Sequence, residues 1–221
     1  MNKTAIEYAD YTWNPVVGCE RGCAYCYARR FAERGLGEYG LYEKGQRFQP
    51  RFFPERLLEP TERLKPAHIF VCSMGELFGP WVPAEWQERV LSAARQTPWH
   101  TFMFLTKYPE NLPQFNPWPD NCWVGATATT SAEAERALSY LADVDAAIRY
   151  ISFEPLHDEI VLDMEILDWG IIGQQTNPDL PPLSGWVYGL IDCLDRAKAK
   201  VFLKDNLHWF VKRQEWPKEE R

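Results

Sequence analysis

The sequence predicts an α/β protein built as a partial, open TIM-like (β/α) barrel of about six to seven parallel strands. Two observations lead to this prediction. Short runs of β-branched and aromatic residues alternate with stretches of helical periodicity, which is the pattern of β/α units on a parallel sheet. In addition, 221 residues suffice for one domain with a substantial core but fall slightly short of a complete eight-stranded barrel.

Seven strands and four helices are expected along the chain. Pro83 suits a first helical turn, Thr130 with Glu133 forms a capping box, and Ser184 is placed to cap the last helix. The expected strands cover residues 11–14, 69–72, 101–105, 122–126, 149–153, 170–172 and 200–203. The expected helices cover residues 27–34, 85–94, 134–141 and the stretch that follows Ser184.

No internal repeat or interdomain linker is evident, so we expect residues 1–221 to form a single domain. Within it, residues 38–66 are rich in Gly, Arg, Phe and Pro without clean periodicity, which is typical of an irregular, lid-like insertion. The last residues, 216–221, are expected to form a frayed tail.

The composition is that of an ordinary soluble protein, with 46% hydrophobic and 25% charged residues. No apolar run approaches the length of a membrane span, so no membrane partner and a cytoplasmic location are expected. A net charge of −7 argues against non-specific attachment to nucleic acid, because phosphate binding depends on Lys and Arg. Four arginines beside the cysteines, Arg21, Arg29, Arg30 and Arg34, are interpreted as a solvated helix face, with a local basic groove as the alternative.

Three cysteines, Cys19, Cys23 and Cys26, carry most of the chemical information in the sequence. Their spacing places three thiolates on one short loop, enough to hold three irons of a cubane cluster and leave the fourth iron without a protein ligand. A structural zinc site would need a fourth close ligand, and a disulfide would need an oxidising compartment, for which no export signal is present. We therefore favour an open 4Fe-4S cluster, with zinc as the alternative.

The Cys-x3-Cys-x2-Cys spacing, with Tyr25 directly before the last cysteine, resembles the signature of the radical S-adenosylmethionine (radical SAM) superfamily. The surrounding residues 11–19 and 27–30 are similar to those of a phage and prokaryotic three-cysteine group of unknown substrate. Further similarities follow in the same order at residues 73–78, 105–107, 152–156 and 202–204. The resemblance implies that Tyr25 lies near the adenine of S-adenosylmethionine.

The resemblance also implies an activity and its cofactors. A reduced 4Fe-4S cluster would cleave S-adenosylmethionine and yield a 5′-deoxyadenosyl radical for hydrogen abstraction, with electrons from an external flavodoxin- or ferredoxin-type reductant. The substrate is unknown, and a nucleotide, a nucleic acid or another anionic molecule is conceivable. Two alternatives remain: a non-catalytic iron–sulfur binding or redox-sensing module, and a zinc-stabilised nucleic-acid-binding protein.

Polar residues follow the predicted strands at their carboxyl ends, where parallel β/α proteins bind their ligands. After the second strand come Ser73, Met74, Gly75 and Glu76. The resemblance implies that they present a backbone edge to the amino group of the cofactor's methionine moiety. The carboxylate of Glu76 would complement that ammonium group.

The later strand ends supply the remaining candidates. Thr127 suits a ribose hydroxyl, and Lys107 suits the cofactor carboxylate or a substrate anion. Glu154 and Lys204 are candidate catalytic residues, with a salt bridge between Glu154 and a lysine at the same edge as the alternative. Gln174 is expected near the cofactor, in a Gly-Gln-Gln-Thr turn where the similar proteins have Gly-Gly-Glu-Ser, so a carboxylate is replaced by an amide.

Overall fold

The computed structural model describes residues 1–217, which divide into two compact units. The first unit comprises residues 1–106 and 119–121, and the second holds the rest of the described chain. Each unit combines parallel strands with helices, so the chain is an α/β protein. The open barrel remains a prediction. No helix among the described residues is both long enough and apolar enough to cross a membrane.

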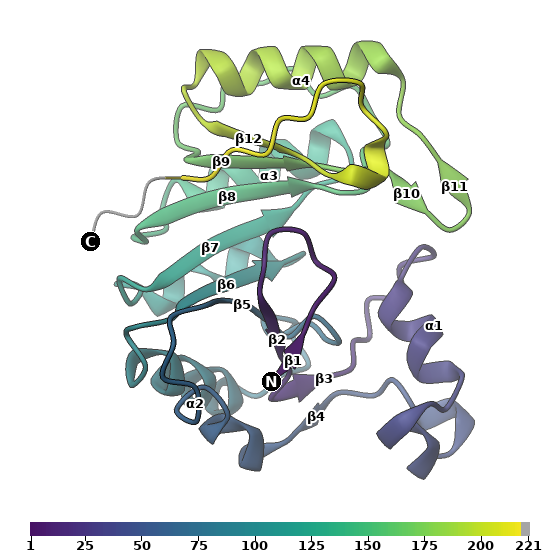
Figure 1. Cartoon of the computed structure of the whole chain (residues 1–221), viewed down its shortest axis with the longest axis vertical. Coiled ribbons are helices and arrows are strands. Elements are labelled where there is room, and N and C mark those ends of the chain that lie inside the picture. The colour runs from purple at the N-terminus through teal and green to yellow at the C-terminus, as the bar shows by residue number, and fades with distance from the viewer. Residues whose placement is uncertain (218–221) are drawn as a thin grey trace. The chain divides into compact units, whose positions relative to one another are not determined.

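The first unit contains four strands in the order β1-β2-β5-β6, of which the last three are parallel (Figure 1). These strands are β1 (Asn2–Lys3), β2 (Tyr11–Trp13), β5 (His68–Val71) and β6 (Thr101–Thr106). β1 pairs antiparallel with β2 and is an edge strand that the sequence analysis did not predict. A separate antiparallel pair joins β3 (Val16–Val17) to β4 (Arg51–Phe52), and so links the start of the cysteine loop to the segment predicted as a lid.

The two α-helices of the first unit, α1 (Tyr27–Glu33) and α2 (Ala84–Arg95), begin close to the predicted positions. Three 3-10 helices that were not predicted lie between them: η1 (Gly37–Leu41), η2 (Lys44–Gln46) and η3 (Pro54–Leu58). Pro83 is the N-cap of α2 and not a residue of its first turn. α1 has Arg34 as its C-cap, and the next residue, Gly35, has a φ of 67° that favours glycine.

The second unit contains four parallel strands in the order β7-β8-β9-β12. They are β7 (Cys122–Thr127), β8 (Ile148–Phe153), β9 (Trp169–Ile172) and β12 (Lys200–Leu203). A hairpin of β10 (Gln175–Thr176) and β11 (Asp179–Leu180) follows β9. All seven predicted strands are therefore present, with ends that differ from the prediction by at most one residue.

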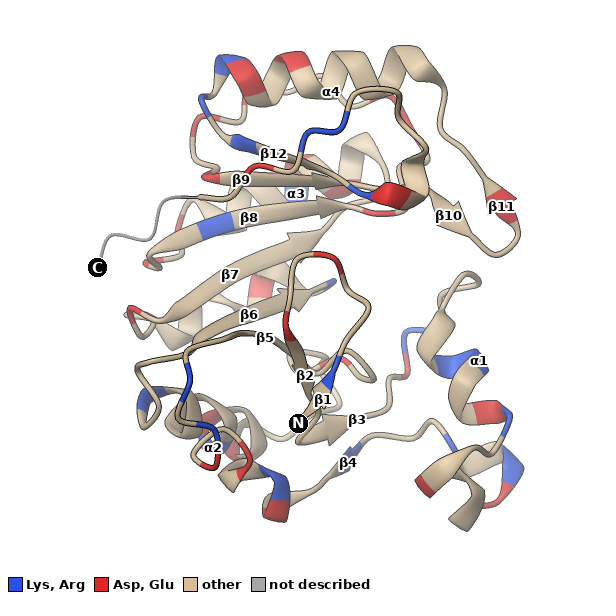
Figure 2. Ribbon diagram, in the orientation of Figure 1, with Lys and Arg blue, Asp and Glu red and all other residues tan. Residues whose placement is uncertain are grey.

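Two helices pack on the sheet of the second unit: α3 contacts β7 and β8, and α4 contacts β9 and β12 (Figure 1). Their bounds, with those of the short 3-10 helices, are α3 (Ser131–Leu141), α4 (Ser184–Arg196), η4 (Pro109–Asn111), η5 (Pro113–Phe115) and η6 (Asp205–Leu207). The charged residues of α4 lie in its last turns (Figure 2). Leu194 of α4 packs directly over Gly170, where a side chain on the glycine would collide with it.

The predicted helix caps are correct only in part. The hydroxyl oxygen of Thr130 accepts the backbone N–H of Glu133 at 3.3 Å, as in a capping box. The Glu133 carboxylate, however, accepts its bonds from the backbone and hydroxyl of Thr129, one residue earlier than expected. The prediction for Ser184 is wrong, because it is the first residue of α4 and the N-cap is Leu183, which makes no side-chain cap bond.

The predicted frayed tail is wrong at its first residue. Trp216 stacks on Trp169, with ring centroids 5.5 Å apart, and also contacts Trp123 and Phe202. Aromatic packing of this kind buries a large apolar area, and Trp13, Trp123 and Trp169 are buried core residues. Residues 218–221 of that prediction lie outside the described residues.

Candidate functional site

The cysteine loop follows β3 in the first unit and ends where α1 begins. Cys19, Cys23 and Cys26 are all free thiols and are all half-buried. Cys26 is the N-cap of α1, and its sulfur accepts the backbone N–H of Arg29 at 3.3 Å. The sulfur of Cys19 accepts the N–H of Arg21 at 3.4 Å. Two of the three sulfur atoms thus accept backbone N–H groups, one from the loop and one from the first turn of α1.

A turn formed by residues 73–76 holds the loop at both ends. The carbonyl of Met74 accepts the N–H of Gly18 at 2.9 Å, and the carbonyl of Gly18 accepts the N–H of Glu76 at 3.2 Å. On the other side of the loop, the Tyr27 hydroxyl donates to the carbonyl of Ser73 at 2.6 Å. The carbonyls of Ser73 and Met74 therefore bond the cysteine loop, and the contact of this turn with the cofactor's amino group stays a prediction.

The segment over residues 38–66, predicted as irregular and lid-like, packs against the loop. The N–H of Cys19 donates to the carbonyl of Phe48 at 3.1 Å, and Phe53 donates to the carbonyl of Pro15 at 2.8 Å. Gly18 has a φ of 87°, and a side chain there would collide with the carbonyl of Gln49. In the structure this segment supports the cysteine loop through hydrogen bonds and a short strand pair.

The loop has a mainly apolar surrounding. Cys19, Cys26 and Met74 pack against a buried cluster of side chains, formed by Ala28, Ala32, Tyr39 and Phe48. Burial raises the pKa of the Cys19 thiol to about 11, with the charge of Glu76 as a further contribution in the same direction. Without a metal this thiol is neutral at pH 7, and metal binding would release its proton.

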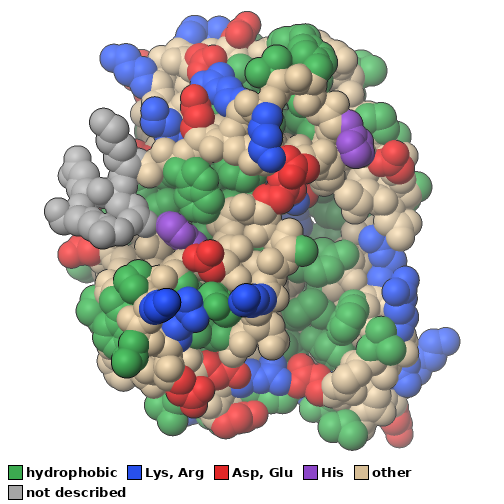
Figure 3. All heavy atoms as spheres, in the orientation of Figure 1, with side chains coloured by type: hydrophobic (Ala, Val, Ile, Leu, Met, Phe, Trp, Pro, Cys, Tyr) green, Lys and Arg blue, Asp and Glu red, His purple; other side chains and the backbone are tan. Residues whose placement is uncertain are grey.

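The arginines near the loop do not all lie on a solvated face. Arg29 is half-buried, donates from Nη2 to the carbonyl of Cys19 at 2.8 Å, and places its guanidinium over the Phe48 ring, 5.2 Å from the centroid. Arg34 is exposed, as predicted. Basic side chains line the visible side of α1 (Figure 3).

The three cysteines fit the thiolate donor set of an iron–sulfur cluster. Among residues 1–217, no three or more His, Cys, Asp or Glu side chains are grouped closely enough to hold a single metal ion. A cubane cluster does not require such convergence, because each thiolate binds a different iron. The N–H bonds to sulfur and the apolar surrounding are environments that iron–sulfur clusters use.

Glu76 is buried next to the loop and only 7% exposed. Its Oε1 accepts the N–H of Phe78 at 3.1 Å and the hydroxyl of Thr106 at 2.6 Å. These bonds keep a carboxylate buried close to the cysteines. Its predicted contact with the cofactor's ammonium group stays a prediction.

The remaining predicted site residues lie in the second unit, where two of them form an ion pair. Lys204, directly after β12, pairs with the carboxylate of Glu154, directly after β8. Asn206 Nδ2 lies 3.4 Å from the same carboxylate and donates to the carbonyl of Gln174 at 3.2 Å. The salt bridge considered as an alternative for Glu154 is thus present, and the catalytic role of the two residues stays a prediction.

Gln174 is 4% exposed, and its side-chain amide bonds the β10–β11 hairpin. Its Nε2 donates to Oδ1 of Asp179, in β11, at 2.6 Å. The amide therefore connects the chain after β9 to the hairpin. A glutamate at position 174 has no N–H group to donate to the carboxylate of Asp179. Lys107 and Thr127, the other two predicted residues, are half-buried at the ends of β6 and β7.

We expect Gln174→Glu to lower the free energy of unfolding by about 1–2 kcal/mol at pH 7, because two carboxylates would then face each other. The repulsion acts only while both carboxylates are charged, so the loss should be full at pH 7 and should shrink as the pH falls toward the ordinary carboxyl pKa of about 4. Urea unfolding at pH 4 and pH 7 measures this. Adding Asp179→Asn should restore stability, and an equal loss at both pH values would contradict the explanation.

Sequence reasoning missed Asn14, Arg29 and Asn206 as residues that organise these sites. Asn14 was counted as the end of a strand, and its amide bonds the turn over residues 73–76. Asn206 follows Lys204 by two residues, so its place near a predicted strand end was the available signal. Arg29 was assigned to a solvent-facing surface because it lies next to other arginines.

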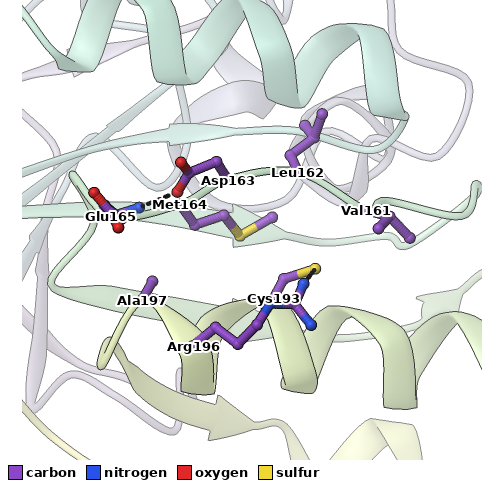
Figure 4. Close-up of a pocket in the computed structure, with 8 residues that line it drawn as sticks. All are labelled: Val161, Leu162, Asp163, Met164, Glu165, Cys193, Arg196 and Ala197. Carbon is purple, nitrogen blue, oxygen red and sulfur yellow. Dashed lines mark hydrogen bonds between the residues drawn. The ribbon is translucent and has the colours of Figure 1, made fainter.

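A cavity of about 430 Å³ also lies in the second unit, beside the last turn of α4 (Figure 4). It is lined by Val161, Leu162, Asp163, Met164, Glu165, Cys193, Arg196 and Ala197. Arg196 reaches back along α4 and donates to the sulfur of Cys193 at 3.0 Å. None of the predicted site residues lines this cavity.

The fold and site define an α/β protein with three free cysteines on one loop. Residues 3–220 match the model of the family described as "Protein of unknown function (DUF5131)", and the chain belongs to that family. No curated protein matches the sequence.

Two solved structures are similar in shape. One is spore photoproduct lyase complexed with dinucleoside spore photoproduct, at 10% identity and a TM-score of 0.49, covering 88% of this chain and 53% of that one. The other is a cysteine-to-alanine mutant of spore photoproduct lyase with the same dinucleoside, at 9% identity and a TM-score of 0.47, covering 89% and 53%. This chain spans about half the length of those proteins. Both TM-scores lie below 0.5, so neither likeness assigns a function.

Proposed function

We propose that this protein is a radical SAM enzyme in which Cys19, Cys23 and Cys26 hold a 4Fe-4S cluster. The observation that carries the proposal is one loop with three free, half-buried thiols at the Cys-x3-Cys-x2-Cys spacing. When bound and reduced, the cluster would supply the electron that cleaves S-adenosylmethionine and starts hydrogen abstraction from a substrate.

The residues of the chain have distinct parts in this proposal. Backbone N–H groups orient the sulfur atoms of Cys19 and Cys26, and the apolar cluster around them limits the access of water. Tyr25 is proposed to contact the adenine and Glu76 the ammonium group of the cofactor. For Glu76, support comes from its burial beside the loop and its fixed carboxylate.

For the second unit we propose that Thr127, Gln174 and Lys107 contribute to cofactor or substrate binding. Glu154 and Lys204 are proposed to act on the substrate as a charged pair. The electrons would come from a flavodoxin- or ferredoxin-type protein. The positive charges of Lys107 and Lys204 suit a nucleotide or another anionic substrate.

The test is anaerobic reconstitution with iron and sulfide, followed by an assay for 5′-deoxyadenosine with dithionite and S-adenosylmethionine. The expected result is a bound cluster, a change in its EPR spectrum on addition of S-adenosylmethionine, and formation of 5′-deoxyadenosine. A bound cluster without these two responses would favour the redox-sensing module instead. Zinc in anaerobically purified protein would favour the zinc-stabilised protein.

A further inference from the structure

Asn14 follows β2, where the chain turns toward the cysteine loop. Its side-chain oxygen Oδ1 accepts two hydrogen bonds, from the backbone N–H of Met74 at 2.9 Å and from the hydroxyl of Ser73 at 3.2 Å. Its backbone carbonyl accepts a third bond, from Nη1 of Arg56 at 3.0 Å. One amide oxygen therefore anchors the start of the turn over residues 73–76.

The two residues that Asn14 anchors, Ser73 and Met74, both hydrogen-bond the residues that flank the cysteines. The carbonyl of Met74 accepts the N–H of Gly18, the residue before the first cysteine. The carbonyl of Ser73 accepts the hydroxyl of Tyr27, the residue after the third cysteine. The position of the turn thus sets the positions of both ends of the loop.

The backbone of this turn needs such an anchor. Cys72, directly before the turn, has a φ of 56°, in the left-handed region that favours glycine. A non-glycine residue stays in that region only where its surroundings hold it. Cys72 is buried after β5, and its N–H donates to the carbonyl of Trp13, next to Asn14.

We propose that Asn14 is a positioning residue that acts through Oδ1 on the turn over residues 73–76, and so fixes the spacing of the three cysteine sulfur atoms. The inference rests on the proposed cluster for its functional meaning. Its structural part, that Asn14 fixes the loop, applies to the protein without metal and has a test of its own.

The first test is hydrogen exchange of the metal-free, full-length chain, read at the amides of Gly18 and Glu76. Asn14→Ala is expected to speed their exchange about ten-fold, because local opening becomes easier when the turn loses its anchor. Asn14→Asp keeps an oxygen at the Oδ1 position, so its exchange should stay near the wild-type rate. Unchanged exchange in Asn14→Ala would overturn the proposal, and so would equally fast exchange in Asn14→Asp.

The matched control is Asn116→Ala. Asn116 bridges the carbonyl of Asp143 and the N–H of Asp145 within the second unit, at 2.6 and 2.9 Å. Its loss should leave exchange at Gly18 and Glu76 unchanged. If Asn14→Ala does not fold, Tyr27→Phe removes the hydroxyl that bonds the carbonyl of Ser73 at the far end of the loop. That variant should change the cysteine alkylation rates in the metal-free chain, and unchanged rates would count against the proposal.

The second readout is the cluster itself after anaerobic reconstitution. Asn14→Ala is expected to bind less iron and to give a broadened EPR spectrum, both rescued in Asn14→Asp. If the wild-type chain binds no cluster, the proposed function fails while the exchange result still decides the role of Asn14. If the wild-type and Asn14→Ala spectra are identical, the functional part of this inference is wrong and the proposed function stands.

Discussion

Alanine in place of Cys19, Cys23 or Cys26 is expected to abolish the iron–sulfur cluster. Reconstituted wild-type protein should hold about four irons per chain, and each variant less than about one, because three thiolates are the whole protein ligand set of such a cluster. Formation of 5′-deoxyadenosine should fall more than about 100-fold, since even partners outside the ligand set cost 10–100-fold when removed. Iron analysis, Mössbauer spectra and product assays measure these effects.

The control for the cysteine variants is Cys193→Ala. Cys193 is a free cysteine like the other three, but it is 2% exposed and lies on α4 in the second unit. Its replacement should leave the iron content unchanged. A complete cluster in any of the three loop variants would refute the proposed function.

Replacing Lys204 by methionine is expected to lower the free energy of unfolding by about 2–3 kcal/mol at pH 7. The side chains of Lys204 and Glu154 are 15% and 24% exposed, so removal of the lysine leaves a largely buried carboxylate without its ion-pair partner. The double variant Lys204→Met/Glu154→Gln should recover most of that loss, because neither charge remains. Urea unfolding of the single and double variants gives both values.

Lys212→Met is the control for this pair. Lys212 and Asp205 form an ion pair with side chains 68% and 63% exposed, and exposed pairs contribute less than about 1 kcal/mol. The double variant also separates structure from catalysis: a stable but inactive protein would support the catalytic role of Glu154 and Lys204, and restored activity would contradict it. Wild-type stability in Lys204→Met would show that the pair contributes nothing to folding.

Much of the secondary structure could be predicted because its signals are local. Runs such as 101–105 and 200–203 are apolar and β-branched, and their strands appear where the pattern placed them. The frayed tail was mispredicted because the signal of Trp216 is not local: its ring packs against Trp169, 47 residues earlier in the chain. The start of α4 was wrong because Ser184 has the composition of a cap but makes no such bond.

The sequence pattern identified candidate site residues but not the partners that hold them. Cys19, Cys23 and Cys26 were recognised from spacing alone; in the structure they are free and lie on one loop, and their role as cluster ligands stays a prediction. Glu76 and Gln174 were recognised as polar residues at strand ends, but their partners were not. That Glu76 bonds Thr106 and Gln174 bonds Asp179 could be seen only in the structure.

By itself the sequence determined the α/β class, the strand positions and the three-cysteine loop, because periodicity and cysteine spacing act over a few residues. Only the tertiary structure decided what holds that loop and which charges meet. Asn14 reaches Met74 across 60 residues and Lys204 reaches Glu154 across 50. Such contacts depend on how strands and turns are brought together in space, and no local pattern encodes them.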